Sequence, residues 1–415
     1  MASEVADPSL ADAGRDRIAW ADAQMPVLVS VRERFAAERP LDGIAVAACL
    51  HVTAETANLV RALVAGGARV ALCAANPLST QDDTAAALAT EDGVEVRARH
   101  GEDLDAYAAH VAALVETEPQ VTLDDGADLA SVLHATRPEA AERMLGGTEE
   151  TTTGLLRLRA LHEEGRLRCP ILAVNEARTE RVFNDRFGTG QSTLDGILRA
   201  TNLLLAGRTF VVLGYGNTGR GVAQRARGAG ASVVVCEIDP VAALEARMEG
   251  FEVLPALRAA ERGDVFVTVT GGRGVLRREH FERMKDGAVL ANAGHFDVEL
   301  DLDALRGLAT GGVRRVRPLV EQYDLGGRRL NLLAGGRVVN LAAAEGHPAA
   351  VMDVSFAVHA LAAEELVVHP RELGPGVHPV PARLDREVAR LKLASLGVEI
   401  DELTAEQERY LTSWG

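Results

Sequence analysis

Short apolar runs alternate with helical patterns along the first half of the chain. Residues 44–50 form an unbroken apolar run, which is typical of a strand buried on both faces of a parallel sheet. The next segment places Leu59 and Leu63 on one helical face and ends at Gly66–Gly67. Further strands are expected at residues 70–73, 94–96 and 121–123. This order predicts a doubly wound α/β unit.

A second α/β unit is expected from about residue 205. It begins with a strand (209–213), a glycine-rich turn (214–219), a helix (about 220–227) and a strand (232–236). Later elements are strands at 265–270 and 288–291, a long apolar helix at 349–369 and a charged helical tail at 383–415. We therefore predict two Rossmann-like domains and a small tail. The first domain takes residues 1–188 and 349–378, the inserted second domain 189–348, and the tail 379–415.

The glycine-rich turn has the context of a dinucleotide-binding loop. Gly214 allows a tight turn, Gly216 lets the backbone approach a pyrophosphate, and Gly219 lets helix and strand pack closely. The helix that follows offers unpaired N–H groups to phosphates. Glu237 ends the next strand, where its carboxylate would accept hydrogen bonds from ribose hydroxyls and repel a 2′-phosphate. The motif predicts NAD rather than NADP.

Charge and composition exclude several classes of function. The formal net charge of −16 argues against nucleic acid and anionic membranes, which need a basic surface. The first residues carry acids and no apolar core, so no signal peptide is expected, and no apolar run approaches the ~18 residues of a membrane helix. We expect a cytoplasmic protein.

Cysteine and lysine usage are both informative. Cysteines 49, 73, 169 and 236 form no CxxC pair and have no histidine at metal-ligand spacing, so we expect buried free thiols and no metal site. The chain has only two lysines, Lys285 and Lys392, among 44 basic residues. An arginine-for-lysine bias by itself carries no functional meaning.

Six segments resemble signatures of the S-adenosylhomocysteine hydrolase family. They are HVTAET (51–56), LDDGADL (123–129), GGTEETTTG (146–154), GYGNTGRG (214–221), NAGHFDVE (292–299) and VVNLAAAEGHP (338–348). The resemblance runs from about residue 8 to residue 414, and the ending ELTAEQERYLTSW is similar to the shorter archaeal and bacterial branch. That branch lacks the Lys- and Tyr-bearing tail of longer members.

The resemblance implies an elimination assisted by a redox step. Tightly held NAD oxidises the ribose 3′-hydroxyl, a base removes the acidified 4′ hydrogen, and the 5′ substituent leaves. Water then adds and the ketone is reduced back, so that the net reaction is a hydrolysis. The first domain would bind substrate and the second NAD, in a cleft that closes on a hinge. The family implies a homotetramer, with the helix at 349–369 and the tail helix as candidate interface elements.

The resemblance also implies roles for individual residues. Histidine can exchange protons near neutral pH, and Asp125 can relay or abstract one. The expected catalytic residues are His51, Asp125, Glu150, Glu180, Asn184 and His295. The expected substrate-binding residues are Thr53, Glu55, Gln81, Thr151, Asp185 and His347. The expected cofactor-binding residues are Thr151, Thr152, Thr153, Asn175, Gly214, Gly216, Asn217, Gly219, Glu237, Thr270, Asn292 and Asn340.

The segment after the first domain departs from the family pattern. Members read N-D-x-x-T-K-x-x-F-D-N, with the lysine and the following aspartate on the sugar 2′ and 3′ hydroxyls. This chain has Glu180 at the lysine position, Asn184 at the aspartate position and Asp185 after it. Neither Lys285 nor Lys392 is placed to replace the amine, and arginine cannot act as a base. Either a carboxylate, with Glu180 favoured, takes the 3′ proton, or 3′ oxidation does not occur in the usual way.

This departure suggests a nucleoside with an altered sugar. The leading hypothesis is a 4′,5′-dehydratase, in which water leaves a psicofuranosyl-adenine-like substrate in nucleoside antibiotic biosynthesis. One alternative is an S-adenosylhomocysteine hydrolase with a rewired proton path, which releases adenosine and homocysteine. A second is a catalytically dead NAD- and nucleoside-binding regulator. A third is an NAD-dependent 2-hydroxyacid dehydrogenase, whose cofactor domain has the same type of fold.

Overall fold

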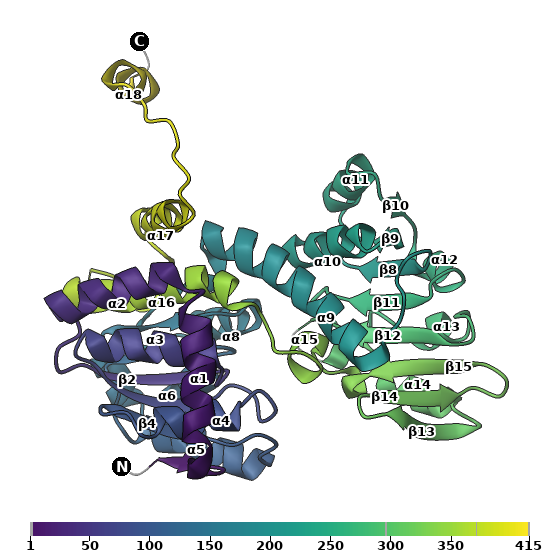
Figure 1. Ribbon diagram of the computed structural model, residues 1–415, viewed down its shortest axis with the longest axis horizontal. Helices are drawn as coiled ribbons and strands as arrows, with labels where there is room; N and C mark the ends of the chain where they lie inside the picture. Colours follow the sequence, from purple (N-terminus) through teal and green to yellow (C-terminus); the bar gives the residue numbers. More distant parts are fainter. Residues whose placement is uncertain (1–2, 295–296, 371, 414–415) are drawn as a thin grey trace.

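The computed structural model describes residues 3–294, 297–370 and 372–413. Its strands form two sheets, each in a separate α/β body (Figure 1). The first sheet has the order β1-β4-β3-β2-β5-β6-β7-β16 and is parallel at every pairing. Its strands are β1 (Glu4–Val5), β2 (Ala45–Leu50), β3 (Arg69–Ala74), β4 (Val94–Ala98), β5 (Val121–Asp124), β6 (Gly146–Glu149), β7 (Pro170–Ala173) and β16 (Gly376–Pro379).

The second sheet has the order β10-β9-β8-β11-β12-β15-β14-β13. It is parallel from β10 to β15, and β14 and β13 add an antiparallel edge. Its strands are β8 (Thr209–Leu213), β9 (Ser232–Cys236), β10 (Glu252–Val253), β11 (Val265–Thr268), β12 (Ala288–Asn292), β13 (Gly312–Arg317), β14 (Val320–Asp324) and β15 (Arg329–Leu333). The predicted α/β class, with two doubly wound units and C-terminal helices, is confirmed.

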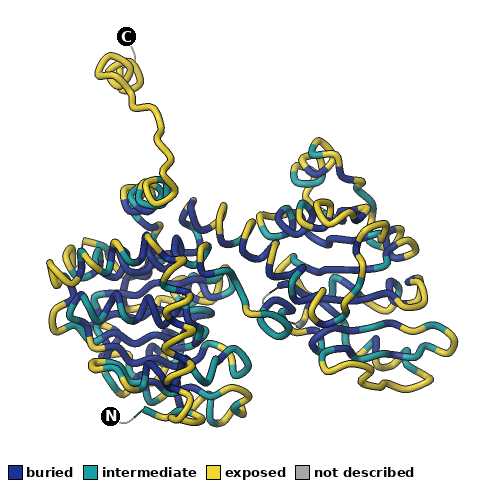
Figure 2. Tube along the Cα trace, in the orientation of Figure 1, coloured by how far each residue is buried: buried dark blue, intermediate teal, exposed yellow. Residues whose placement is uncertain are grey.

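Helices cover both faces of each sheet, which buries the apolar strands between them (Figures 1 and 2). The first body contains α1 (Ala11–Asp22), α2 (Pro26–Glu38), α3 (Ala54–Ala65), α4 (Asp82–Leu88), α5 (Leu104–Val115), α6 (Asp128–Thr136), α7 (Pro138–Arg143), α8 (Thr152–Glu163) and α16 (Ala349–Val368). The second contains α10 (Asn217–Gly228), α11 (Pro240–Met248), α12 (Ala256–Ala260), α13 (Arg278–Phe281), α14 (Leu302–Leu308) and α15 (Val339–Ala342). Single-turn elements are η1 (Pro8–Leu10), η2 (Val174–Glu176), η4 (Asp297–Glu299) and η5 (Ala334–Gly336).

Two connections join the bodies, and both pass the cleft between them. The first is the π-helical segment η3 (Glu180–Gly188), which runs directly into α9 (Thr189–Thr201). The second leads from α15 into α16. Strand membership follows the division expected from the sequence, and we propose the same domain limits, with β16 ending one residue beyond position 378.

The C-terminal region contains the expected long apolar helix and helical tail. The helix α16 is buried within the first body against α2, α3 and α17, so most of its surface is already covered within one chain. The tail is two helices, α17 (Ala382–Ser395) and α18 (Ala405–Thr412), and the chain from Leu396 to α18 extends away from the body (Figures 1 and 2). Within the described residues, no helix has the length and apolar character to cross a membrane.

Candidate active site

Strand order in both sheets reverses beside the same cleft. In the first sheet β2 lies between β3 and β5, and in the second β8 lies between β9 and β11. Because connections leave such a strand in opposite directions, a crevice opens at its carboxyl end, where α/β proteins bind ligands. A cavity of about 430 Å³ occupies this place and is lined by residues of both bodies. Its volume suits a ligand of nucleoside size.

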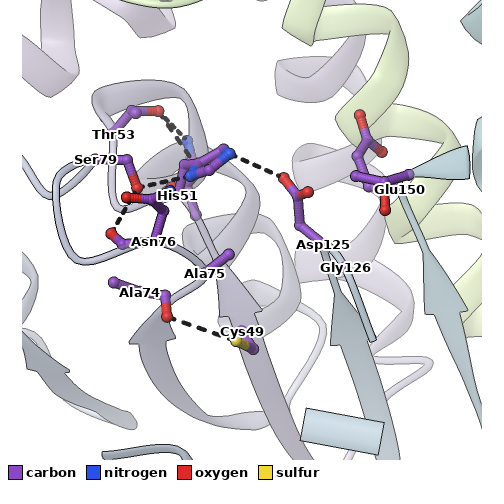
Figure 3. A network of polar contacts seen from close by, with 12 residues as sticks. Cys49, His51, Thr53, Ala74, Ala75, Asn76, Ser79, Asp125, Gly126 and Glu150 are labelled. Atoms are coloured by element: carbon purple, nitrogen blue, oxygen red, sulfur yellow. Dashed lines mark hydrogen bonds and ion pairs between the residues drawn. The ribbon is translucent and has the colours of Figure 1, made fainter. Parts of the chain in front are cut away.

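His51 and Asp125 meet at the reversal of the first sheet. His51 follows β2 and Asp125 follows β5, and Figure 3 shows the imidazole between Ser79 and Asp125. His51 Nδ1 lies 2.6 Å from Ser79 Oγ, and His51 Nε2 lies 3.3 Å from Asp125 Oδ2. Ser79 gives its own proton to the carbonyl of Asn76, so it accepts from Nδ1–H. The contact between Nε2 and Asp125 then needs a further proton, which the pair can transfer to or from a ligand.

Glu150 lies directly after β6 and is held by three donors. Asn184 Nδ2 and Ser355 Oγ donate to Oε1 at 3.0 and 2.8 Å, and His359 Nε2 contacts Oε2. These contacts fix the carboxylate at the wall of the cavity. Burial raises the pKa of Glu150 to about 8.

The segment η3 brings the residues that depart from the family pattern into the same cavity. Glu180, Asn184 and Gly188 are its buried positions, and Glu180 and Asn184 line the cavity together with Asp185. Glu180 Oε2 is buried without a hydrogen-bond partner among the described residues. Burial, followed by the charge of Glu150, raises the pKa of Glu180 well above its usual range. Burial also raises the pKa of Asp185 to about 6.

This wall of the cavity is short of positive charge. None of the described residues that line the cavity is lysine or arginine. Lys285 Nζ pairs with Asp264 at 3.0 Å and Lys392 Nζ with Asp353 at 2.8 Å, both outside the cavity. Burial beside neighbouring carboxyls favours the protonated form of an acid. Glu180 is therefore favoured in its protonated form in the resting site, where it is a hydrogen-bond donor.

Glu180→Gln is expected to stabilise the protein at alkaline pH. An acid whose pKa is raised on folding stabilises the native state fully below its unfolded pKa, and that stabilisation is lost as pH rises toward the folded pKa. Glutamine keeps the shape and cannot ionise. Denaturant unfolding should therefore show a free energy of unfolding roughly 1 to 3 kcal/mol above that of the wild type at pH 8, and little difference at pH 4. The exposed Glu163→Gln serves as control, and equal stability at pH 8 would contradict a buried Glu180 proton.

The remaining substrate-side residues come from other segments of the chain. Thr53 caps α3 and Glu55 lies in its first turn, and both line the cavity. His347 also lines it, and its Nε2 lies 3.0 Å from Thr189 Oγ1. Burial lowers the pKa of His347 to about 4, so the ring is neutral. Gln81 does not line this cavity, and its Oε1 accepts from Ala54 N at 3.0 Å.

A second cavity, of about 910 Å³, lies at the reversal of the second sheet. It is lined by Gly214, Gly216, Glu237 and Thr270. A Cβ at Gly216 would meet nothing within 4 Å, and Gly216 leaves the N-terminus of α10 without a side-chain cap. A Cβ at Gly219 would overlap the carbonyl oxygen of Gly214. These residues fit a dinucleotide, with open space for phosphates beside unpaired N–H groups.

Glu237→Ala is expected to weaken NAD binding about 10- to 100-fold. Glu237 Oε2 accepts from Tyr215 N at 2.6 Å, and Oε1 accepts from Ile238 N and Asp239 N. The carboxylate is thereby held at the mouth of the cavity, where ribose hydroxyls can donate to it. Calorimetric titration of NAD into cofactor-stripped protein measures the loss, with the exposed Glu261→Gln as control. Unchanged affinity would contradict a ribose contact at Glu237.

Several residues expected to contact the cofactor form hydrogen bonds with neighbouring residues in the loops around the cavities. Thr151 Oγ1 donates to Glu149 Oε1, and Thr152 Oγ1 donates to Asn175 Oδ1, both at 2.8 Å. Asn292 Oδ1 accepts from Gly294 N. The expected residues that line the main cavity are His51, Thr53, Glu55, Asp125, Glu150, Thr151, Thr152, Thr153, Asn175, Glu180, Asn184, Asp185, Thr270, Asn340 and His347. Those that line neither main nor dinucleotide cavity are Gln81, Asn217, Gly219 and Asn292. His295 lies outside the described residues.

Sequence reasoning missed three side chains that hold the expected ones. Ser79 contacts His51, while Ser355 and His359 contact Glu150. Ser355 and His359 are four residues apart in α16, a spacing that puts both on one helical face. The sequence signal that could have found Ser355 and His359 is their polar character within the otherwise apolar run of this helix.

Comparisons with known proteins agree with this geometry. Residues 2–144 match the model of S-adenosyl-L-homocysteine hydrolase, and residues 185–346 match the model of its NAD binding domain. The chain is 59% identical over 415 residues to the adenosylhomocysteinase of Aquifex aeolicus, covering 100% of this chain and 99% of that one. The chain belongs to the S-adenosyl-L-homocysteine hydrolase family.

Other relatives in the family span the whole chain as well. The S-inosyl-L-homocysteine hydrolase of Methanopyrus kandleri is 53% identical, covering 99% of this chain and 97% of its own length. The adenosylhomocysteinase of Saccharolobus solfataricus is also 53% identical, over 100% and 99%. The second body is thus an NAD-binding domain, and the protein is an NAD-dependent enzyme of the hydrolase family. Family membership sets aside a 2-hydroxyacid dehydrogenase.

Proposed function

We propose that the enzyme oxidises the 3′-hydroxyl of an adenine nucleoside, removes the 4′ proton and expels the 5′ substituent. With S-adenosylhomocysteine, the outcome is hydrolysis to adenosine and homocysteine. The observation that carries this proposal is the meeting of His51–Asp125, Glu150 and the NAD domain at one cavity. Full-length identity of 59% to an adenosylhomocysteinase supports hydrolysis as the net reaction.

The positions of the side chains in the cavity suggest a different role for each in the reaction. When bound, NAD would accept a hydride from the sugar and return it later. Glu150 is the acceptor for the proton of the 3′-hydroxyl, since it is the carboxyl that three donors hold in place. His51 and Asp125 exchange protons at the 4′ and 5′ positions. The protonated Glu180 donates a hydrogen bond to the sugar.

Incubation of the NAD-loaded enzyme with S-adenosylhomocysteine tests the hydrolase. Homocysteine release in steady state, with a thiol reagent as detector, is the expected result. Bound NAD that is never reduced by any nucleoside would instead indicate a regulator that only binds nucleotides. Release of homocysteine at a rate no faster than in an enzyme-free control would overturn the hydrolase.

A second candidate is a nucleoside 4′,5′-dehydratase. The observation that favours it is the replacement of a cation by the buried Glu180, with Asn184 and Asp185 in exchanged order beside it. The change is confined to the wall assigned to the 2′ and 3′ face of the sugar. A psicofuranosyl adenine carries an extra hydroxymethyl group at the anomeric carbon, which would crowd this wall.

Dehydration uses the same first steps and stops before water adds. The 4′ proton and the terminal hydroxyl leave together as water, and the ketone is reduced back. Incubation with psicofuranine should then give a product lighter by one water, with transient absorbance of bound NADH. No loss of water and no transient absorbance would remove this candidate. The ratio of the two activities in one preparation decides between them.

A further inference from the structure

A buried histidine lies behind Glu150, on the side away from the cavity. His359 is 0% exposed and is absent from the cavity wall, so it cannot touch a substrate. Its Nε2 contacts Glu150 Oε2, while Ser355, one helical turn earlier in α16, donates to Oε1. Glu150 is thus anchored from behind on both oxygens.

The second ring nitrogen of this imidazole contacts a hydroxyl group. His359 Nδ1 lies 2.8 Å from Thr148 Oγ1, on β6 and two residues before Glu150. A hydroxyl can donate or accept, so Thr148 can donate to Nδ1 and leave the ring proton on Nε2, where it faces Glu150. Burial lowers the pKa of His359 to about 3, which agrees with a neutral ring that donates through Nε2.

Oxidation of an alcohol needs a proton acceptor. The role inferred here for His359 rests on the proposed function, in which the enzyme oxidises the 3′-hydroxyl. When the C3′–H bond breaks, the hydride goes to bound NAD, the O–H proton goes to a base and a carbonyl bond forms. The groups that face Glu150 are His359 of α16, Glu180 and Asp185 of η3, and Asp125 after β5. Three of these four are acids, and each disfavours the ionised form of Glu150 that a base requires.

We propose that His359 is the positioning residue that favours the ionised form of Glu150 and aims it at the sugar, so that Glu150 accepts the hydroxyl proton in place of an amine. The ring donates one hydrogen bond to the carboxylate and receives one from Thr148. Proton uptake by Glu150 breaks no contact, because the acid keeps its Ser355 and Asn184 donors on the other oxygen.

The test compares His359→Leu, His359→Gln and the wild type by stopped-flow absorbance of bound NADH across pH. In His359→Leu the carboxylate loses a hydrogen bond. The pH at which the rate of NADH formation reaches half its maximum should therefore rise by about one to two units. His359→Gln retains an N–H donor and should fall between. Substrate KM should stay within about threefold, since His359 does not touch the ligand. His134→Gln, at a buried histidine bonded to the carbonyl of Ala130, is the matched control.

An infrared titration of the NAD-loaded protein gives a readout that needs no turnover. The carboxylic acid band that is lost in Glu150→Gln reports protonation of Glu150, and its midpoint should rise in His359→Leu by the same shift. If no nucleoside reduces the wild-type cofactor, the proposed function fails while this titration still decides the role of His359. Should His359→Leu not fold, Thr148→Val is expected to move the midpoint in the same direction. An unchanged midpoint in the folded variants overturns the inference.

Discussion

Glu150→Gln is expected to lower the rate at which a nucleoside reduces bound NAD by about 100-fold or more. The amide cannot accept the hydroxyl proton, and general-base catalysis contributes about 10²- to 10⁴-fold. Glutamine has nearly the same shape: its amide oxygen can still accept from Asn184 and Ser355, and its NH2 group can donate to His359 Nε2 once the ring proton moves to Nδ1. Single-turnover absorbance of NADH after mixing with substrate measures the step directly.

Two controls accompany this variant. NAD content and substrate affinity should stay near those of the wild type, because the change removes a proton acceptor and leaves both cavities intact. The exposed Glu163→Gln should react at the wild-type rate. A Glu150→Gln enzyme that reduces its cofactor within a few-fold of the wild-type rate would assign the base to another group.

The double variant Glu180→Lys with Asn184→Asp is expected to raise homocysteine release at least about tenfold. It returns a cation to a cavity wall that includes Glu150 and Asp185 and has no lysine or arginine among its described lining residues. A neighbouring ammonium lowers the pKa of those carboxyls and supplies an amine near the sugar hydroxyls. Turnover of a psicofuranosyl adenine should fall in the same variant if the altered wall serves that sugar.

Steady-state assays of both substrates on the same preparation check this expectation. Glu180→Gln separates loss of the acid from gain of the amine, and Glu180→Lys alone tests whether the aspartate is needed. A double variant that binds NAD yet leaves both activities unchanged would show that the departure at 180–185 lies outside the reaction path.

The parts of the fold that could be predicted have strong local patterns. β2 is an unbroken apolar run and β8 is apolar after Thr209, and each is followed by residues with special backbone or chemistry, so both loops at the sheet reversals were found. The glycine spacing after β8 identified the cofactor loop, because each glycine is needed at its position for a steric reason. By contrast, β13 is exposed at every position and β14 follows a bulge, so neither shows the alternation of a half-buried strand.

Features that depend on distant contacts could not be predicted. Nothing in ERVFNDRFG specifies a π-helix, yet that geometry brings Glu180 and Asn184 to Glu150. The protonation of Glu180 follows from burial beside Glu150, which lies thirty residues earlier in the sequence. His359 was hidden in the apolar pattern of α16, because a buried histidine at one helical position is usually part of the core.

The most direct test mixes the NAD-loaded enzyme with S-adenosylhomocysteine and, separately, with psicofuranine, following NADH absorbance and quenched products together. We predict that at least one nucleoside gives rapid NADH formation that precedes loss of its 5′ substituent and accelerates as pH rises toward about 8, where Glu150 ionises. Product without any NADH phase, or an oxidation rate that does not change with pH, would contradict a carboxylate-driven oxidation in this cavity.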